Sequence, residues 1–91
     1  MVKAATHYWF VYMVECADKS IYTGITTNIK NRIDTHNAGE GAKYTRSRLP
    51  VKLLIHWEYS NRSEATKREM AIKRLSKFQK LQLIQNKKGE V

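Results

Sequence analysis

Residues 10–27, FVYMVECADKSIYTGITT, decide the fold of this chain. The stretch opens with aromatic and β-branched residues, is broken by the polar segment ADKS, and resumes as the short run IYTGI. Two apolar runs joined by a polar turn predict a β-hairpin. The first run is apolar on both of its alternating faces, which favours a central strand buried on both sides.

The hairpin carries two tyrosines, Tyr12 and Tyr22, ten residues apart. Tyr12 closes a strongly apolar run, and Tyr22 lies two residues before a glycine. Both could be core aromatics, or both could take part in chemistry, and the hairpin pattern alone leaves the two interpretations open.

The elements that follow are predicted from periodicity and capping residues. Asn28 can cap a helix over residues 29–38 that stops at Gly39. A loop rich in glycine and cations over residues 39–50 leads to a third strand over residues 51–59, and a second helix is expected over residues 61–75. The resulting order, β-β-α-β-α-α, indicates an α+β domain with a three-stranded antiparallel sheet and flanking helices.

The last helix is expected over residues 77–85. Ser76 and Gln79 have the spacing of a capping box at its start. Its apolar stripe is predicted to be Phe78, Leu81, and Leu83 or Ile84, with residues 86–91 as a frayed tail.

Size and charge bound the class of protein. The 91 residues predict one domain over 1–91 with a core from about residue 7 to residue 85, and the formal net charge is +9. The cations and acids of residues 1–27 cancel, so the excess lies in the rest of the chain. This asymmetry favours a nucleic-acid partner and not a membrane, because the basic helices lack a long apolar face. Cys16 is the single cysteine, which excludes an intramolecular disulfide and fits a cytoplasmic protein.

Glu69 interrupts a core-facing stripe. Ala65, Ile72 and Leu75 define the buried side of the second helix, and the spacing places Glu69 on that side. Glutamate is rarely buried unless it is paired or bound to a metal. Glu69 is therefore either a metal ligand or a partner of Lys73 one turn later, and the spacing does not decide between them.

Arg32 and His36 lie one turn apart on the first helix, beside the apolar positions Ile29 and Ile33. Such a pair could form a phosphate pocket, since guanidinium matches phosphate oxygens, or it could be a solvated flank. The residues show no zinc-ligand spacing, no Walker glycine–lysine loop and no GxSxG motif, so those site classes are excluded.

These residues together resemble one known pattern. FVY followed by YTG ten residues on is similar to the two signature tripeptides of the GIY-YIG nuclease superfamily, and the similarity extends through GAKYTRSRLPVKL and RSEATKREMAIKRLS. Within that superfamily the chain resembles the small stand-alone bacterial YhbQ-like group.

The resemblance implies an endonuclease that hydrolyses phosphodiester bonds with one divalent ion, Mg²⁺ or Mn²⁺. In that scheme Tyr12 is the general base and Tyr22 a second phenol that orients water or phosphate. Arg32 contacts the scissile phosphate, His36 assists the nucleophile or the phosphate, and Glu69 holds the metal. One carboxylate suffices because Mg²⁺ keeps several waters and takes further oxygens from the substrate.

The chain departs from the signatures at three positions. Phe10 replaces the first signature glycine, and Thr23 replaces the middle residue of the second tripeptide. Ile25 stands where several family nucleases carry a lysine that would depress the tyrosine pKa. Lys43 or His36 would have to take over that role.

The basic loop is the predicted nucleic-acid surface. Contacts to backbone phosphates, which carry little sequence information, are expected from Lys43, Arg46 and Arg48 around Tyr44. The resemblance favours DNA over RNA, with a role in DNA repair or recombination, and a chain of this size would rely on its own basic surface or on a targeting protein partner. The alternatives are a catalytically silent nucleic-acid-binding module of the same fold and an adaptor that docks on an acidic protein.

Overall fold

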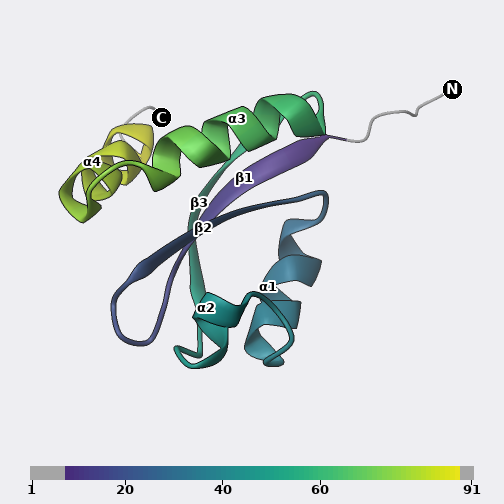
Figure 1. The fold of residues 1–91 in the computed structure, drawn as a ribbon, viewed down its shortest axis with the longest axis vertical. Helices are drawn as coiled ribbons and strands as arrows, with labels where there is room; N and C mark the ends of the chain where they lie inside the picture. Colours follow the sequence, from purple (N-terminus) through teal and green to yellow (C-terminus); the bar gives the residue numbers. More distant parts are fainter. Residues whose placement is uncertain (1–7, 89–91) are drawn as a thin grey trace, which may run out of the picture.

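The computed structural model describes residues 8–88. In chain order the elements are β1 (Trp9–Glu15), β2 (Ile21–Thr26), α1 (Ile29–Asn37), α2 (Lys43–Arg46), β3 (Lys52–Tyr59), α3 (Arg62–Lys73) and α4 (Lys77–Lys88) (Figure 1). The predicted α+β class and the order of the main elements are confirmed. The expected start of the first strand at His7 lies outside the described residues, as do residues 89–91 of the expected tail.

The three strands form one antiparallel sheet in the order β2-β1-β3, so β1 is the central strand as predicted. Tyr12 is paired with Gly24 on β2 and with His56 on β3. Because side chains alternate along a strand, Tyr12 and Val14 face one side of the sheet while Val11 and Met13 face the other. The two faces therefore belong to different cores.

Helices cover both faces of the sheet, with α3 on one side and α1 and α2 on the other (Figure 1). The core under α3 contains buried side chains from β1, β3 and the helices: Val11, Met13, Ile55, Ala65, Ile72 and Ile84. The core toward α1 is smaller and contains Tyr12, Val14, Cys16 and Val51, with Tyr22, Ile29 and Ile33 packed against it. This smaller core is where the aromatic and polar residues of interest meet.

The helix ends follow the predicted caps. Asn28 accepts a hydrogen bond from the Asn31 amide at 3.0 Å at the start of α1, and Gly39 follows its end with φ of +81°. Gln79 and Ser76 exchange the two hydrogen bonds of a capping box at the start of α4.

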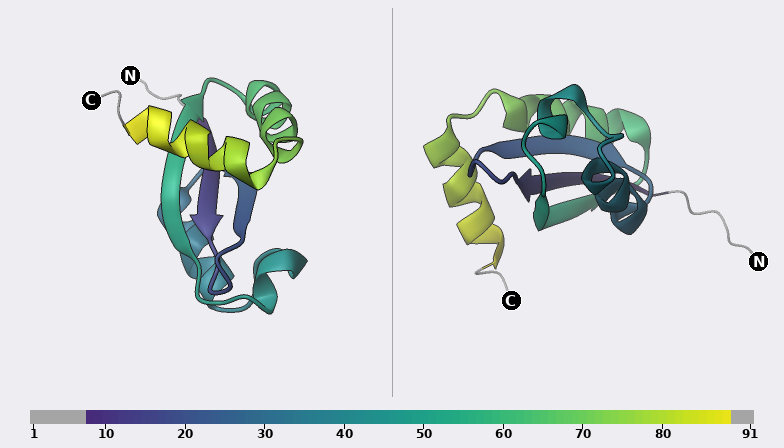
Figure 2. Two further views of the ribbon diagram at one scale, coloured as in Figure 1. Left: turned by 90° about the vertical axis from the view of Figure 1, so that its left-hand side faces the viewer. Right: turned by 90° about the horizontal axis from the view of Figure 1, so that it is seen from below.

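Three predictions about local structure are wrong. Lys43–Arg46 form the helical turn α2 inside the segment expected to be irregular, because four residues are too few to show a helical period. The predicted stripe on α4 holds only for its second half, since Ile84 is buried while Phe78 is 67% and Leu81 is 47% exposed. The helix turns away from the end of α3, so its first turns do not lie on the sheet (Figure 2).

The third concerns the end of α4, which is predicted at residue 85, whereas the helix continues to Lys88. In the part of the chain that the structure describes, no helix is long and apolar enough to cross a membrane.

Candidate active site

Tyr12 lies in the middle of the sheet with its phenol directed across β2. Only 1% of its surface is exposed. A Cβ atom at position 24 would lie 2.6 Å from the Tyr12 Oη atom, so the space occupied by the phenol exists only because Gly24 has no side chain. The glycine of the second tripeptide is therefore required by the position of the first tyrosine.

A buried chain of hydrogen bonds joins β1 to the far end of α1 and to α2. Tyr12 Oη lies 2.7 Å from His36 Nε2, and His36 Nδ1 lies 2.8 Å from Thr45 Oγ1. Thr45 Oγ1 in turn donates to the carbonyl oxygen of Ala42 at 2.9 Å. His36 and Thr45 are both fully buried. A Cβ atom at Gly41 would collide with the imidazole, so this glycine closes the packing around His36.

Arg32 is the cation nearest to this chain. Its Nε atom donates to Tyr12 Oη over a long 3.4 Å, and its side chain is half-buried. Burial raises the pKa of Tyr12 to about 12, and the charge of Glu69 adds to that rise while Arg32 opposes it. Burial lowers the pKa of His36, and the positive charge of Arg32 lowers it further. At neutral pH the site therefore holds a neutral phenol against a neutral imidazole.

Tyr22 connects the phenol of Tyr12 to the surface. Its ring centroid lies 6.4 Å from that of Tyr12, 5.5 Å from that of His36 and 6.0 Å from that of Tyr44. The rings of Tyr22 and Tyr44 are stacked at 22°, and the Arg48 guanidinium covers Tyr44 at 3.9 Å from the ring centroid. This aromatic cluster of Tyr12, Tyr22, His36 and Tyr44 runs from the core to the exposed edge of the sheet.

Glu69 reaches the same edge from α3. Its side chain is 17% exposed and pairs with Lys73, with Oε2 and Nζ 3.2 Å apart. The Lys73 ammonium also lies 5.7 Å from the centroid of the Tyr22 ring. Both interpretations of Glu69 therefore keep a structural basis: the pair with Lys73 is formed, and the charge of the carboxylate contributes to the raised pKa of Tyr12.

A groove follows the start of β2 and ends at Tyr22. Two adjoining cavities of about 290 and 320 Å³ share Ile21, Tyr44 and Lys80. We call this feature the lysine groove, and its walls include Tyr22, Tyr44, Lys73, Lys77 and Lys80. Among residues 8–88, neither Lys77 nor Lys80 has a carboxylate within ion-pair distance.

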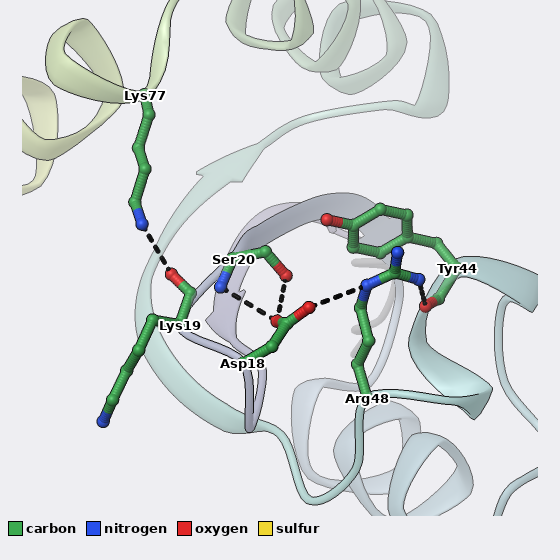
Figure 3. A network of polar contacts seen from close by, with 6 residues as sticks. All are labelled: Asp18, Lys19, Ser20, Tyr44, Arg48 and Lys77. Carbon is green, nitrogen blue, oxygen red and sulfur yellow. Dashed lines mark hydrogen bonds and ion pairs between the residues drawn. The ribbon is translucent and has the colours of Figure 1, made fainter.

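The outer end of the lysine groove is held by a polar network (Figure 3). Lys77 donates to the carbonyl oxygen of Lys19 at 2.9 Å, and Asp18 accepts from Ser20 and from Arg48. Arg48 also donates to the carbonyl oxygen of Tyr44 at 2.7 Å. These bonds hold the Asp18 pKa below its usual range, mainly through Ser20, and join the hairpin turn to the segment after α2 and to the start of α4.

The structure brings together most of the predicted site residues. Those that meet in one region are Tyr12, Tyr22, Arg32, His36, Tyr44 and Glu69. Lys43 and Arg46 are exposed, while Arg48 is engaged by Asp18 and Tyr44. Sequence reasoning missed Thr45, because no periodicity links it to a histidine nine residues earlier across a glycine-containing turn. It also gave Lys73 only the role of a pairing partner.

Comparison with known proteins gives one consistent family. Residues 8–82 match the model of the GIY-YIG catalytic domain. A UPF0213 protein of Staphylococcus haemolyticus is 53% identical over 83 residues, which are 91% of this chain and 99% of that protein. A UPF0213 protein of Natronomonas pharaonis is 48% identical over 86 residues, 94% of this chain and 99% of that protein.

Solved structures agree with this match. The solution NMR structure of the UPF0213 protein BH0048 from Bacillus halodurans has a TM-score of 0.60 at 43% identity, covering 91% of this chain and 88% of that one. The solution NMR structure of the protein EF2693 from E. faecalis has a TM-score of 0.63 at 40% identity, covering 100% of this chain and 95% of that one.

Proposed function

The chain belongs to the GIY-YIG catalytic domain family, and from that premise we propose that it is a divalent-metal-dependent endonuclease that hydrolyses phosphodiester bonds in DNA. The observation that carries the proposal is the buried hydrogen bond between Tyr12 and neutral His36 beside Arg32. A module that only binds nucleic acid has no need for a phenol held against an unprotonated imidazole inside the core.

The proposed role of Tyr12 is that of a proton relay. A phenol with a pKa of about 12 is a poor base on its own at neutral pH. If Tyr12 passes its proton to His36 Nε2 while it takes one from the attacking water, no free phenolate has to form. His36 then holds the proton as an imidazolium and returns it through Tyr12 when the leaving oxygen is protonated.

Arg32 and Tyr22 are proposed to bind the phosphate that is attacked. Arg32 makes only a long contact to Tyr12, so it can turn toward a phosphate oxygen and leave room for water beside the phenol. Hydrogen bonds in a free site are often long and tighten only with substrate. Tyr22 is half-buried between Tyr12 and the lysine groove, where its hydroxyl can orient water or phosphate.

Glu69 is the residue proposed to hold Mg²⁺ or Mn²⁺. Within residues 8–88, no cluster of three or more histidine, cysteine or acidic side chains is available for a metal. The single, partly accessible carboxylate of Glu69 still fits Mg²⁺, which keeps most of its waters and binds substrate phosphate oxygens. The bound ion would neutralise charge on the phosphate, and Lys73 would have to yield the carboxylate to it.

The DNA strand is proposed to run from the attacked phosphate at Tyr22 along the lysine groove. Lys73 ends α3, and Lys77 and Lys80 lie one turn apart at the start of α4. All three line the groove, where they can contact successive phosphates of one strand. Lys43, Tyr44, Arg46 and Arg48 are proposed as the neighbouring contacts on the α2 side. Because these groups would contact phosphates, the protein would discriminate weakly among sequences.

Salt dependence tests the path of the strand. Lys77 and Lys80 changed together to alanine should flatten the slope of log affinity against log salt by about 0.7–0.9 for each lost phosphate contact. The matched control removes the same charge at Lys30 and Lys67, which are exposed and paired elsewhere. Equal effects of the two double variants would mean that only overall charge matters and that the groove is not the path.

The proposal extends to a cytoplasmic role in DNA repair or recombination, with DNA in preference to RNA and a protein partner that selects the target. Its support is the family match together with the excess of cations. The second candidate, a catalytically silent binding module, is favoured by the ion pair that Lys73 forms with Glu69, since an occupied carboxylate needs no metal.

The deciding experiment compares Tyr12→Phe with the wild type on branched, single-stranded and duplex DNA, with Mg²⁺ or Mn²⁺ and with EDTA. Cleavage should fall by about 10²-fold or more, while affinity in EDTA stays nearly constant. Tyr59→Phe is the control, because that ring packs in the core on the α3 side of the sheet. Metal-dependent cleavage that survives Tyr12→Phe would refute the role of Tyr12 in the reaction. Absence of cleavage by the wild type on every substrate would favour the silent module.

A further inference from the structure

Thr45 is the innermost residue of α2 and is fully buried. Its hydroxyl lies between two groups, the imidazole Nδ1 of His36 at 2.8 Å and the carbonyl oxygen of Ala42 at 2.9 Å. The backbone amides of Thr45 and Arg46 also donate to that carbonyl, at 3.1 and 3.2 Å. The short helix thus fixes both the threonine and the acceptor for its hydroxyl proton.

Counting protons along this chain selects one tautomer of His36. The Ala42 carbonyl oxygen, 2.9 Å from Thr45 Oγ1, can only accept, so the single hydroxyl proton of Thr45 points to it in the arrangement that avoids two facing oxygen lone pairs. Thr45 Oγ1 is then left with lone pairs toward His36, and the Nδ1 atom must carry the imidazole proton. The Nε2 atom is consequently unprotonated and accepts the hydroxyl proton of Tyr12 at 2.7 Å.

The opposite tautomer leaves unfavourable contacts at both ends. With the proton on Nε2, Thr45 would have to turn its hydroxyl toward Nδ1, and two oxygen lone pairs would then face each other across 2.9 Å at Ala42. Tyr12 Oη would accept from both His36 and Arg32, and its own buried proton would lose its acceptor. Because leaving a buried polar group unpaired is unfavourable, one tautomer is selected.

We propose that Thr45 is a positioning residue that holds His36 in the Nδ1–H tautomer, so that Nε2 stays free to receive the proton of Tyr12. This inference rests on the proposed nuclease function and adds to it the residue that sets the direction of proton transfer. Thr45 acts through His36 and does not touch the substrate. Gly41 assists by leaving space for the imidazole next to the threonine.

The first test reads the tautomer directly in the free protein, without DNA or metal. At a pH where the imidazole is neutral, long-range ¹H–¹⁵N correlation spectra show which of the two ring nitrogens of His36 carries the proton. The wild type and Thr45→Ser are expected to show the Nδ1–H form. Thr45→Val keeps the shape but removes the acceptor, so the Nε2–H form should become populated. Thr23→Val, the same change at another buried threonine on the opposite face of the sheet, should leave the spectrum of His36 unchanged.

The second test measures cleavage by the same variants. Thr45→Val should lower kcat by about 10- to 100-fold with little change in KM, because part of a general-base contribution of 10²–10⁴-fold is lost. Thr45→Ser should recover most of that loss. A wild-type His36 in the Nε2–H form would overturn the proposal even if Thr45→Val fails to fold, and so would a Thr45→Val protein that keeps the wild-type tautomer. If the variants show the expected tautomers but the wild type cleaves no substrate, the nuclease function is overturned. The role of Thr45 in setting the tautomer of His36 would still be supported.

Discussion

The pH dependence of cleavage separates a relay through Tyr12 from a free phenolate. The perturbation is a change of pH from 5 to 9 at fixed ionic strength, with Mg²⁺ saturating. The pKa values that matter are those of the free protein, which kcat/KM reports, namely about 12 for Tyr12 and a value below the usual 6.5 for His36. In a plot of kcat/KM against pH, the relay predicts a rise at the acid end of the range. A free phenolate predicts a rise that continues to the alkaline end.

The magnitudes differ enough to decide. If Tyr12 had to ionise first, its pKa of about 12 would impose a cost of roughly 7 kcal/mol at pH 7, at 1.36 kcal/mol per unit. The rate would then rise tenfold per pH unit, or about 100-fold from pH 7 to pH 9. If His36 accepts the proton, more than about 75% of the imidazole is already neutral at pH 7, so the same interval should raise kcat/KM by less than about 1.3-fold.

The sign of the acid limb follows from the lowered pKa of His36. Protonation of the imidazole removes the acceptor, so activity should fall only when the pH drops below that value, which lies under 6.5. Initial rates of cleavage of a labelled oligonucleotide provide the assay, and Tyr12→Phe provides the background that rises with hydroxide alone. A tenfold rise per unit between pH 7 and pH 9 in the wild type, absent from Tyr12→Phe, would refute the relay and assign catalysis to the phenolate.

Three further substitutions test the metal-ligand role of Glu69, the contact of Gly24 with Tyr12 and the buried hydroxyl of Thr23. Glu69→Gln should change stability by no more than about 0.5 kcal/mol, because the pair with Lys73 is partly exposed, yet it should abolish metal-dependent cleavage and Mn²⁺ broadening of nearby NMR signals; normal cutting would contradict the metal-ligand role. Gly24→Ala should cost about 1–3 kcal/mol and displace Tyr12, since the new methyl would lie 2.6 Å from Oη, and an unchanged melting temperature would argue against this contact. Thr23→Val should leave stability unchanged or raise it by up to about 1 kcal/mol, because among residues 8–88 its buried hydroxyl has no hydrogen-bond partner; thermal melts would reveal a loss if the hydroxyl is in fact satisfied.

The fold was predictable because its signals are local. Alternating apolar runs, a polar turn, Asn28 and the Ser76 capping box each act within a few residues, and the structure follows them. The predicted burial of Phe78 and Leu81 is wrong because a stripe on a helix shows which side is apolar but not whether the sheet extends far enough to cover it. That depends on where α4 leaves α3, which is a tertiary property.

The site was predictable only in part, and for the same physical reason. The resemblance identified Tyr12 and His36, but not the hydrogen bond that joins their side chains within the core. Thr45 comes into contact with His36 through a turn of helix that has no periodic signal, and the ion pair of Lys73 was foreseen without its position over Tyr22. Contacts between residues on separate elements depend on packing that no local pattern encodes.

The missing lysine of the second signature is explained by the side of the sheet on which it would lie. Ile25 pairs with Val11, and both side chains pack in the core under α3, whereas Tyr12 faces α1. A lysine at position 25 would therefore leave the strand on the side away from His36. A cation is needed to lower the pKa of a phenol that must ionise, but not for a phenol that hands its proton to a neutral imidazole. In the proposed relay, Tyr12 can keep a pKa of about 12 in an apolar core without a cation at position 25, where Ile25 packs in the core on the opposite face.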